Sequence, residues 1–146
     1  MYYFAYGSNM SLEHMRRICG WHCQFLGRAR LSGYGNCLDK RGFLNIDPQE
    51  NAEIFGILYS VDEDGLGMLD DFEGYPTVFD RKEVTVFDDH NIKYKAQVYI
   101  EPVGNCGGMQ YRQEYFRRVI AAAYENRLPE EYIKKIESLI EGKEKI

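Results

Sequence analysis

The sequence lacks the features that mark several large classes of protein. No apolar run approaches the roughly 18 residues of a membrane-spanning helix. The net charge is −5, and no basic run or Lys/Arg face interleaved with aromatics is present, so nucleic-acid binding is not expected. The first residues carry no basic segment, apolar segment or cleavage site typical of a secretion signal, and we expect a cytoplasmic protein. Repeats, linkers and low-complexity segments are also missing, which predicts one domain over residues 1–146.

Cysteine is scarce, and its spacing argues against a metal site. The four cysteines are Cys19, Cys23, Cys37 and Cys106, and no two of them form a C-x-x-C pair. His14 and His22 lie near the first two, but a Cys-x₃-Cys spacing without a second matching pair is poor for zinc. Reduced and mostly buried thiols are favoured instead. We therefore expect no zinc site.

The most informative stretch is at the start of the chain. Apolar and aromatic residues from Tyr2 to Tyr6 predict a buried strand, residues 7–9 (Gly-Ser-Asn) end it abruptly, and Ser11 is a good N-cap for a helix through about Cys19. A strand, a tight turn and a helix start in this order direct several backbone N–H groups at one point. Such a nest favours an anion or a developing oxyanion. From these residues alone, an ordinary strand-to-helix turn remains the alternative.

The rest of the chain alternates between strand and helix patterns. A half-buried strand is predicted at Phe25–Leu31, and Ser32–Gly42, rich in Gly, Asn, Asp and Lys, reads as a long mobile loop. A short strand closed by Asp47-Pro48 and a buried central strand at Glu53–Ser60 are predicted next, followed by a helix capped by Asp62 and stopped at Gly74. A hairpin is predicted from Arg81–Phe87 and Ile92–Ile100, with a Pro/Gly loop at Glu101–Gly108 after it. The last predicted elements are a helix over Gln110–Asn126 and a final helix with Pro129 at its first position.

Glu73 lies on an unusual face of its predicted helix. At about 100° per residue, Leu66 and Leu69 define the inner face, and Glu73 falls between them. A carboxylate there points toward the core or into a cleft, whereas Asp64, Asp70 and Asp71 can reach solvent or the helix flank more easily. Desolvation would raise its pKa toward neutrality, which suits a general acid or base. The pattern leaves open that the helix frays before Glu73 and lets its side chain reach water.

Two segments carry a resemblance to a known family. Tyr6-Gly7-Ser8-Asn9-Met10 resembles the Tyr-Gly-Ser-Asn signature of the γ-glutamylcyclotransferase family, which also follows a first strand. Leu69–Gly74 resembles the Leu-Asp-x-x-Glu-Gly segment of that family, whose Glu is the catalytic acid/base, and Glu73 stands at that position.

Further matches follow in the same order along the chain. They are the strand Ile54–Tyr59, Tyr115 near the C-terminal helix, and Asn126–Tyr132, which resembles a Gly/Asn-x-Leu-Pro-x-x-Tyr segment. One departure is Phe79-Asp80-Arg81, where many relatives carry Tyr-x-Arg. The phenolic hydroxyl is missing here, together with any substrate contact that it makes in those relatives.

The resemblance implies a fold and a reaction. The expected fold is α+β, a small mixed β-barrel or curled sheet flanked by helices. The expected reaction is cyclisation of a γ-glutamyl amino acid or γ-glutamylamine to 5-oxoproline, with Glu73 as acid/base and no cofactor or metal. The residues expected to bind the substrate are Tyr6, Gly7, Ser8, Asn9, Met10 and Tyr115.

The sequence leaves several alternatives open. The signature is closer to the γ-glutamyl-amino-acid and γ-glutamylamine branches than to the glutathione-specific one, and the segments Ser32–Gly42 and Glu101–Gly108 are expected to shape this choice. One rival function is a non-catalytic domain that binds an acidic metabolite. The other is an oligomeric interaction module with a Tyr-rich interface. The expected partner is a small γ-glutamyl molecule rather than a nucleic acid or a membrane, with a homodimer left open.

Overall fold

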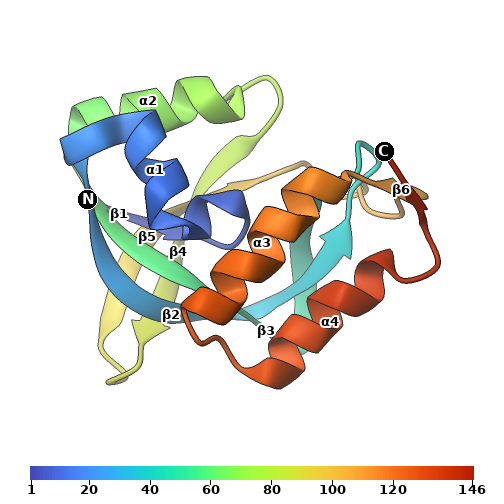
Figure 1. Cartoon of the computed structure of the whole chain (residues 1–146). Coiled ribbons are helices and arrows are strands. Elements are labelled where there is room, and N and C mark those ends of the chain that lie inside the picture. The colour runs from blue at the N-terminus through green and yellow to red at the C-terminus, as the bar shows by residue number, and fades with distance from the viewer.

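Five strands close into a barrel in the computed structural model, which describes residues 1–146 (Figure 1). The strands are β1 (Tyr2–Ala5), β2 (Cys23–Leu38), β3 (Leu44–Val61), β4 (Asp80–Asp88) and β5 (Lys93–Ile100), in the order β1-β3-β2-β4-β5. Neighbours pair antiparallel, except that β1 meets β5 in parallel at Tyr3 and Gln97 and so closes the barrel. The expectation of an α+β fold with a mixed barrel is confirmed.

Strands β2 and β3 form a hairpin far longer than the sequence pattern predicted. Their register runs without a loop from Cys23 opposite Val61 to Leu38 opposite Leu44. The mobile loop predicted for residues 32–42 is therefore wrong up to residue 38. The strand break predicted at Asp47-Pro48 is also wrong, because β3 passes through both residues. Two register shifts absorb the irregular residues as bulges. Pro48 is tolerated because β3 has only β2 as a neighbour at that point.

Helices cover the barrel in two groups (Figure 1). A 3₁₀ turn η1 (Ser8–Met10), α1 (Leu12–Cys19), a second 3₁₀ turn η2 (Gly20–His22) and α2 (Glu63–Glu73) form one group, and α3 (Gln113–Glu125) and α4 (Glu130–Ile140) form the other. Short strands β6 (Gln110–Tyr111) and β7 (Glu144–Lys145) pair beside them, so α3 starts three residues later than predicted. None of these helices is long and apolar enough to cross a membrane.

The helix ends follow local sequence signals. Ser11 Oγ accepts a hydrogen bond from the His14 N–H at 3.3 Å, and Asp62 Oδ1 accepts one from the Gly65 N–H at 2.7 Å. Gly74 ends α2 with a φ of 72°, a left-handed conformation that favours glycine. These three predictions are confirmed. Pro129 is the residue before α4 rather than its first residue.

The core fills the barrel and the space beneath the helices. It contains 34 buried hydrophobic residues, among them the fully buried Phe4, Ile57, Tyr59, Leu69 and Phe116. β3 crosses β1 so closely at Gly56 that an added Cβ would lie 2.2 Å from the Ala5 carbonyl oxygen. The predicted buried strand at Glu53–Ser60 is thus the inner part of β3.

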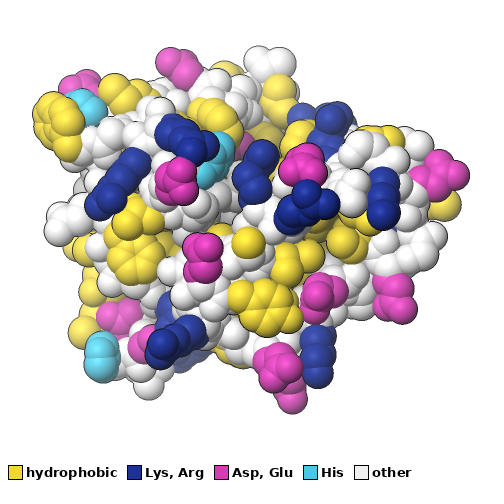
Figure 2. Space-filling model, in the orientation of Figure 1, with side chains coloured by type: hydrophobic (Ala, Val, Ile, Leu, Met, Phe, Trp, Pro, Cys, Tyr) yellow, Lys and Arg dark blue, Asp and Glu magenta, His cyan; other side chains and the backbone are white.

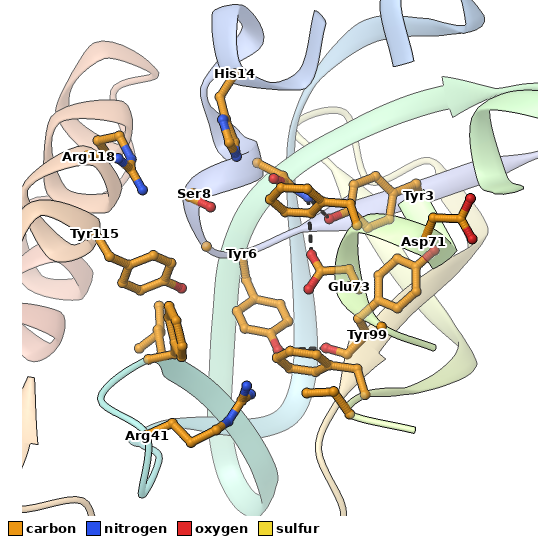
Figure 3. Close-up of a pocket in the computed structure, with 18 residues that line it drawn as sticks. Tyr3, Tyr6, Ser8, His14, Arg41, Asp71, Glu73, Tyr99, Tyr115 and Arg118 are labelled. Carbon is orange, nitrogen blue, oxygen red and sulfur yellow. Dashed lines mark hydrogen bonds between the residues drawn. The ribbon is translucent and has the colours of Figure 1, made fainter. Parts of the chain in front are cut away.

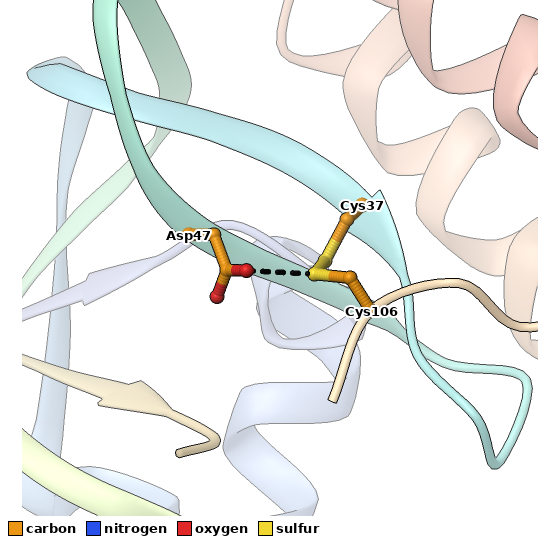
Figure 4. Close-up of side chains that lie close together, drawn as sticks. All are labelled: Cys37, Asp47 and Cys106. Carbon is orange, nitrogen blue, oxygen red and sulfur yellow. Dashed lines mark hydrogen bonds between the residues drawn. A yellow bond between two sulfur atoms is a disulfide. The ribbon is translucent and has the colours of Figure 1, made fainter. Parts of the chain in front are cut away.

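The cysteines behave differently from the prediction in one respect. Cys19 and Cys23 are free and buried, as expected, but Cys37 and Cys106 form a disulfide with their Cα atoms 5.7 Å apart (Figure 4). The bond joins the end of β2 to the segment after β5, 69 residues away along the chain. Only the tertiary fold brings these two thiols together, so spacing along the sequence did not reveal the pair.

Candidate active site

One cavity of about 340 Å³ opens beside the first turn of the chain. Its wall comes from β1 and η1, from α1, from the C-terminal end of α2, from the segment between β2 and β3, and from α3 (Figure 3). The polar and charged lining residues are Tyr3, Tyr6, Ser8, Asn9, His14, Arg41, Asp71, Glu73, Tyr99, Tyr115 and Arg118. A cavity of this size matches the lower end of small-molecule sites.

The turn after β1 forms part of the wall of this cavity. The N–H groups of Met10 and Ser11 donate to the carbonyls of Gly7 and Ser8 and close the 3₁₀ turn. The N–H groups of residues 7–9 precede these bonds and have no partner within the turn, which is the usual state of a helical N-terminus. An added Cβ at Gly7 would lie 2.7 Å from Tyr115 Oη, so a side chain at this position would require Tyr115 to shift. Gly7 and the Tyr115 hydroxyl are therefore neighbours at the cavity wall.

Glu73, the last residue of α2, faces the same cavity. Asn9 Nδ2 donates to Glu73 Oε1 at 3.3 Å and to Tyr3 Oη at 2.9 Å. Burial raises the pKa of Glu73 from 4.5 to about 7, although the positive charge of Arg41 and the bond from Asn9 act in the opposite direction. The helix does not fray before Glu73, which settles the alternative that the pattern left open. At neutral pH this carboxyl can both accept and release a proton.

Tyrosines form much of the remaining wall, and hydrogen bonds to other residues fix the hydroxyl groups of two of them. Tyr6 Oη donates to the Tyr99 carbonyl at 2.6 Å, and Tyr99 Oη donates to Asp70 Oδ1 at 2.7 Å. Asp70 also pairs with Arg81. Asp70 therefore lies at the helix flank, where it bonds Tyr99 and Arg81. Burial raises the pKa of Tyr6, Tyr99 and Tyr115, so these hydroxyls stay neutral.

Arg41 occupies the opposite side of the cavity, and nearby carboxylates compensate its positive charge. Its guanidinium donates to Glu101 Oε1 at 3.0 Å and lies 3.7 Å from the buried Asp39 carboxylate. It also lies over the rings of Phe43 and Phe79, 5.2 and 5.4 Å from their centroids. Phe79, the departure from the family pattern, thus packs against a cation, which needs a ring but no hydroxyl.

The structure gathers most of the predicted site residues. Tyr6, Gly7, Ser8, Asn9, Glu73 and Tyr115 all line the cavity. Met10 is not among the lining residues: its side chain is fully buried in the core, and its N–H donates to the Gly7 carbonyl within the turn. A part for Met10 in substrate binding stays a prediction.

Some lining residues were missed by the sequence reasoning, notably Tyr3, His14, Arg41, Tyr99 and Arg118. Arg118 could have been found, because it lies one helical turn beyond Tyr115 and so shares its face. Arg41 had no local signal, since it lies where the pattern read as a mobile loop.

One further cluster contains residue types that can bind metals, but two of its members are not available as ligands. Ligand atoms of Cys37, Asp47 and Cys106 lie within 4.8 Å of one another. The two sulfurs are bonded to each other, and a thiolate rather than a disulfide binds metals.

Comparison with known proteins decides the family. The family model described as γ-glutamyl cyclotransferase, AIG2-like, matches residues 3–118, which include Glu73 and the turn after β1. The chain belongs to this family. The match also contains Tyr115 and Arg118 of the cavity wall.

Two related proteins and one solved structure match most of the length of this chain. A protein of Methanocaldococcus jannaschii, provisionally named a γ-glutamylcyclotransferase, is 30% identical over 112 residues, 73% of this chain and 88% of the relative. The γ-glutamylcyclotransferase of Bos taurus is 29% identical over 150 aligned positions, 94% of this chain and 77% of the relative. A solved structure named γ-glutamyl cyclotransferase shares the fold, with a TM-score of 0.84, 23% identity and coverage of 94% and 86% of the two chains. Family membership indicates a γ-glutamylcyclotransferase-like activity.

Proposed function

We propose that this chain converts a γ-glutamyl amino acid or γ-glutamylamine to 5-oxoproline and a free amine. The observation that carries the proposal is the Glu73 carboxyl, which faces the cavity with a pKa of about 7 beside the donor-rich turn. In this reaction the α-amine of the substrate attacks its own γ-carbonyl carbon. The new C–N bond closes the ring, and the amide bond to the departing amine breaks.

Glu73 serves both proton transfers in this proposal. As a carboxylate it takes a proton from the attacking α-amine, and as the resulting acid it returns that proton to the departing nitrogen. One group performs both steps well only if its pKa lies near the working pH. Burial gives Glu73 that property, and the hydrogen bond from Asn9 at 3.3 Å holds its orientation.

The turn after β1 binds the negative charge of the substrate. Its N–H groups hold the glutamyl α-carboxylate or stabilise the oxyanion that forms on the γ-carbonyl. Because the reaction is intramolecular, holding the glutamyl chain in a folded-back conformer supplies much of the acceleration. The Tyr115 hydroxyl, which lies 2.7 Å from where a Cβ of residue 7 would be, leaves no room for a side chain there and supports this role.

Release of 5-oxoproline tests the proposal. The panel consists of several γ-glutamyl amino acids, γ-glutamyl-ε-lysine and glutathione, each with wild type, Glu73→Gln and the control Glu63→Gln. Glu63 lies exposed in the first turn of the same helix, so its variant makes the same chemical change away from the cavity. Turnover that Glu73→Gln alone abolishes is the expected result. A folded protein that binds 5-oxoproline but turns over nothing would favour the non-catalytic binding domain.

A further inference from the structure

We propose that Arg118 and His14 form a subsite for the carboxylate of the departing amino acid, so that γ-glutamyl amino acids are preferred over γ-glutamylamines. The inference rests on the proposed function and names the substrate class within it. Both side chains line the cavity, one from α3 and the other from α1 (Figure 3).

Arg118 carries a positive charge that the protein does not compensate. Its side chain is exposed, and it takes part in none of the ion pairs of the structure. The preceding residue, Arg117, instead pairs with Glu114 at 3.0 Å along the same helix. Figure 3 shows the guanidinium of Arg118 directed toward Ser8 at the cavity turn. An unpaired cation on the wall of a cavity is well placed for an anionic ligand.

His14 adds a second unused group beside it. Its Nε2 atom is shielded from solvent and has no hydrogen-bond partner in the protein. Phe72 packs edge-on against the ring, with the centroids 5.4 Å apart. Burial and the nearby charges of Arg118 and Arg17 lower the pKa of His14, which favours the neutral ring. With its proton on Nε2, this ring donates one hydrogen bond to a carboxylate oxygen.

The other cation of the cavity, Arg41, does not offer a comparable site. Two buried carboxylates, Glu101 and Asp39, already balance its charge, and two aromatic rings cover it. The side of the cavity near α1 and α3 is therefore the side with spare positive charge. On the face shown in Figure 2, Lys and Arg side chains lie over these two helices with Asp and Glu side chains among them.

The position of this subsite suits the departing group rather than the glutamyl group. The backbone donors of the turn are sufficient for one anion, and Arg118 adds capacity for a second. In Figure 3, Ser8 lies between Arg118 and Glu73, so a substrate at the turn has one of them on each side. The departing group must leave to solvent, and of Arg118 and Glu73 it is Arg118 that has the exposed side chain.

Two substrates that differ only in one carboxylate test the assignment: γ-glutamyl-L-alanine and γ-glutamylethylamine. A charge-assisted hydrogen bond contributes roughly 10- to 100-fold, so wild type should prefer the alanine compound by about tenfold or more in kcat/KM. Arg118→Gln should remove this preference through KM and leave the ethylamine compound within about twofold. Arg118→Lys should restore part of it, and Arg117→Gln should leave both substrates unchanged. His14→Phe should weaken only the alanine compound.

Equal losses on both substrates would assign Arg118 to the shared glutamyl group and overturn the proposal, as would no loss on either. Calorimetry can measure the affinity of both compounds for the Glu73→Gln variant, with and without the additional substitution Arg118→Gln. This gives the preference between the two compounds in the absence of turnover. A preference seen in binding but without turnover in wild type would contradict the proposed reaction and leave the subsite standing.

Discussion

Replacing Glu73 with Gln should abolish turnover and, at the same time, stabilise the protein above neutral pH. The isosteric amide keeps an oxygen for the hydrogen bond from Asn9 but removes a charge that burial disfavours. The difference between a pKa of about 7 and the ordinary 4.5 corresponds to about 3 kcal/mol, at 1.36 kcal/mol per pH unit. The ionised carboxylate is therefore a source of instability in the folded state.

The sign of the pH dependence follows from proton binding. Between pH 4.5 and about 7 the folded protein holds the Glu73 proton more tightly than the unfolded chain does. Its free energy of unfolding therefore falls as pH rises through this range and levels off above it. Glu73→Gln lacks this dependence, so its stability relative to wild type should grow from near zero at pH 4 to about 3 kcal/mol at pH 8. For a chain of this length that corresponds to roughly 6–12 °C in Tm.

Thermal or urea unfolding of wild type, Glu73→Gln and Glu63→Gln at pH 5, 6, 7 and 8 measures the effect. Glu63 is exposed, so its variant should follow wild type at every pH. A gain for Glu73→Gln that does not change with pH, or a loss at pH 8, would show that Glu73 is not desolvated in the folded state. The argument for its acid/base role would then lose its physical basis.

Three further predictions concern the same architecture. The kcat/KM of wild type should fall by nearly tenfold per pH unit below about 7, because the proposed first step needs the Glu73 carboxylate, and a flat profile would place the base elsewhere. Gly7→Ala should raise KM by roughly tenfold through the 2.7 Å contact of the new Cβ with Tyr115 Oη, and Tyr115→Phe in the same protein should recover part of the loss because it removes the contacting oxygen. Reduction of the Cys37–Cys106 disulfide should lower the free energy of unfolding by about 2–4 kcal/mol, as measured by urea unfolding with and without dithiothreitol, and an unchanged midpoint would exclude a stabilising bond.

Local signals in the sequence predicted the features that depend on neighbours along the chain. Ser11, Asp62 and Gly74 mark helix ends because capping involves residues only a few positions apart. The inward direction of Glu73 follows from helical periodicity, which needs no knowledge of what the helix packs against. The strand, turn and helix around residues 2–19 were readable for the same reason, and the resemblance to the family pointed to the same residues.

Features that depend on distant partners were decided by the tertiary structure alone. Residues 32–38 carry loop-like composition, yet they are strand because they pair with β3, with one register shift between Ser32 and Tyr34. Cys37 meets Cys106 only because the segment after β5 returns to the end of β2. The side chain of Met10 is buried in the core, which the motif alone did not indicate.

The division is clearest in the cavity. The sequence by itself indicated one inward carboxyl and one tight turn, because both are properties of short segments, and it left open an ordinary turn and a frayed helix end. Only the fold decided which charges surround them: Arg41 lies against Asp39 from its own segment and Glu101 from the segment after β5, and Arg118 is left uncompensated beside His14. Charge compensation and desolvation depend on contacts across the whole chain, and these contacts exist only once the barrel has closed and α3 has packed against η1.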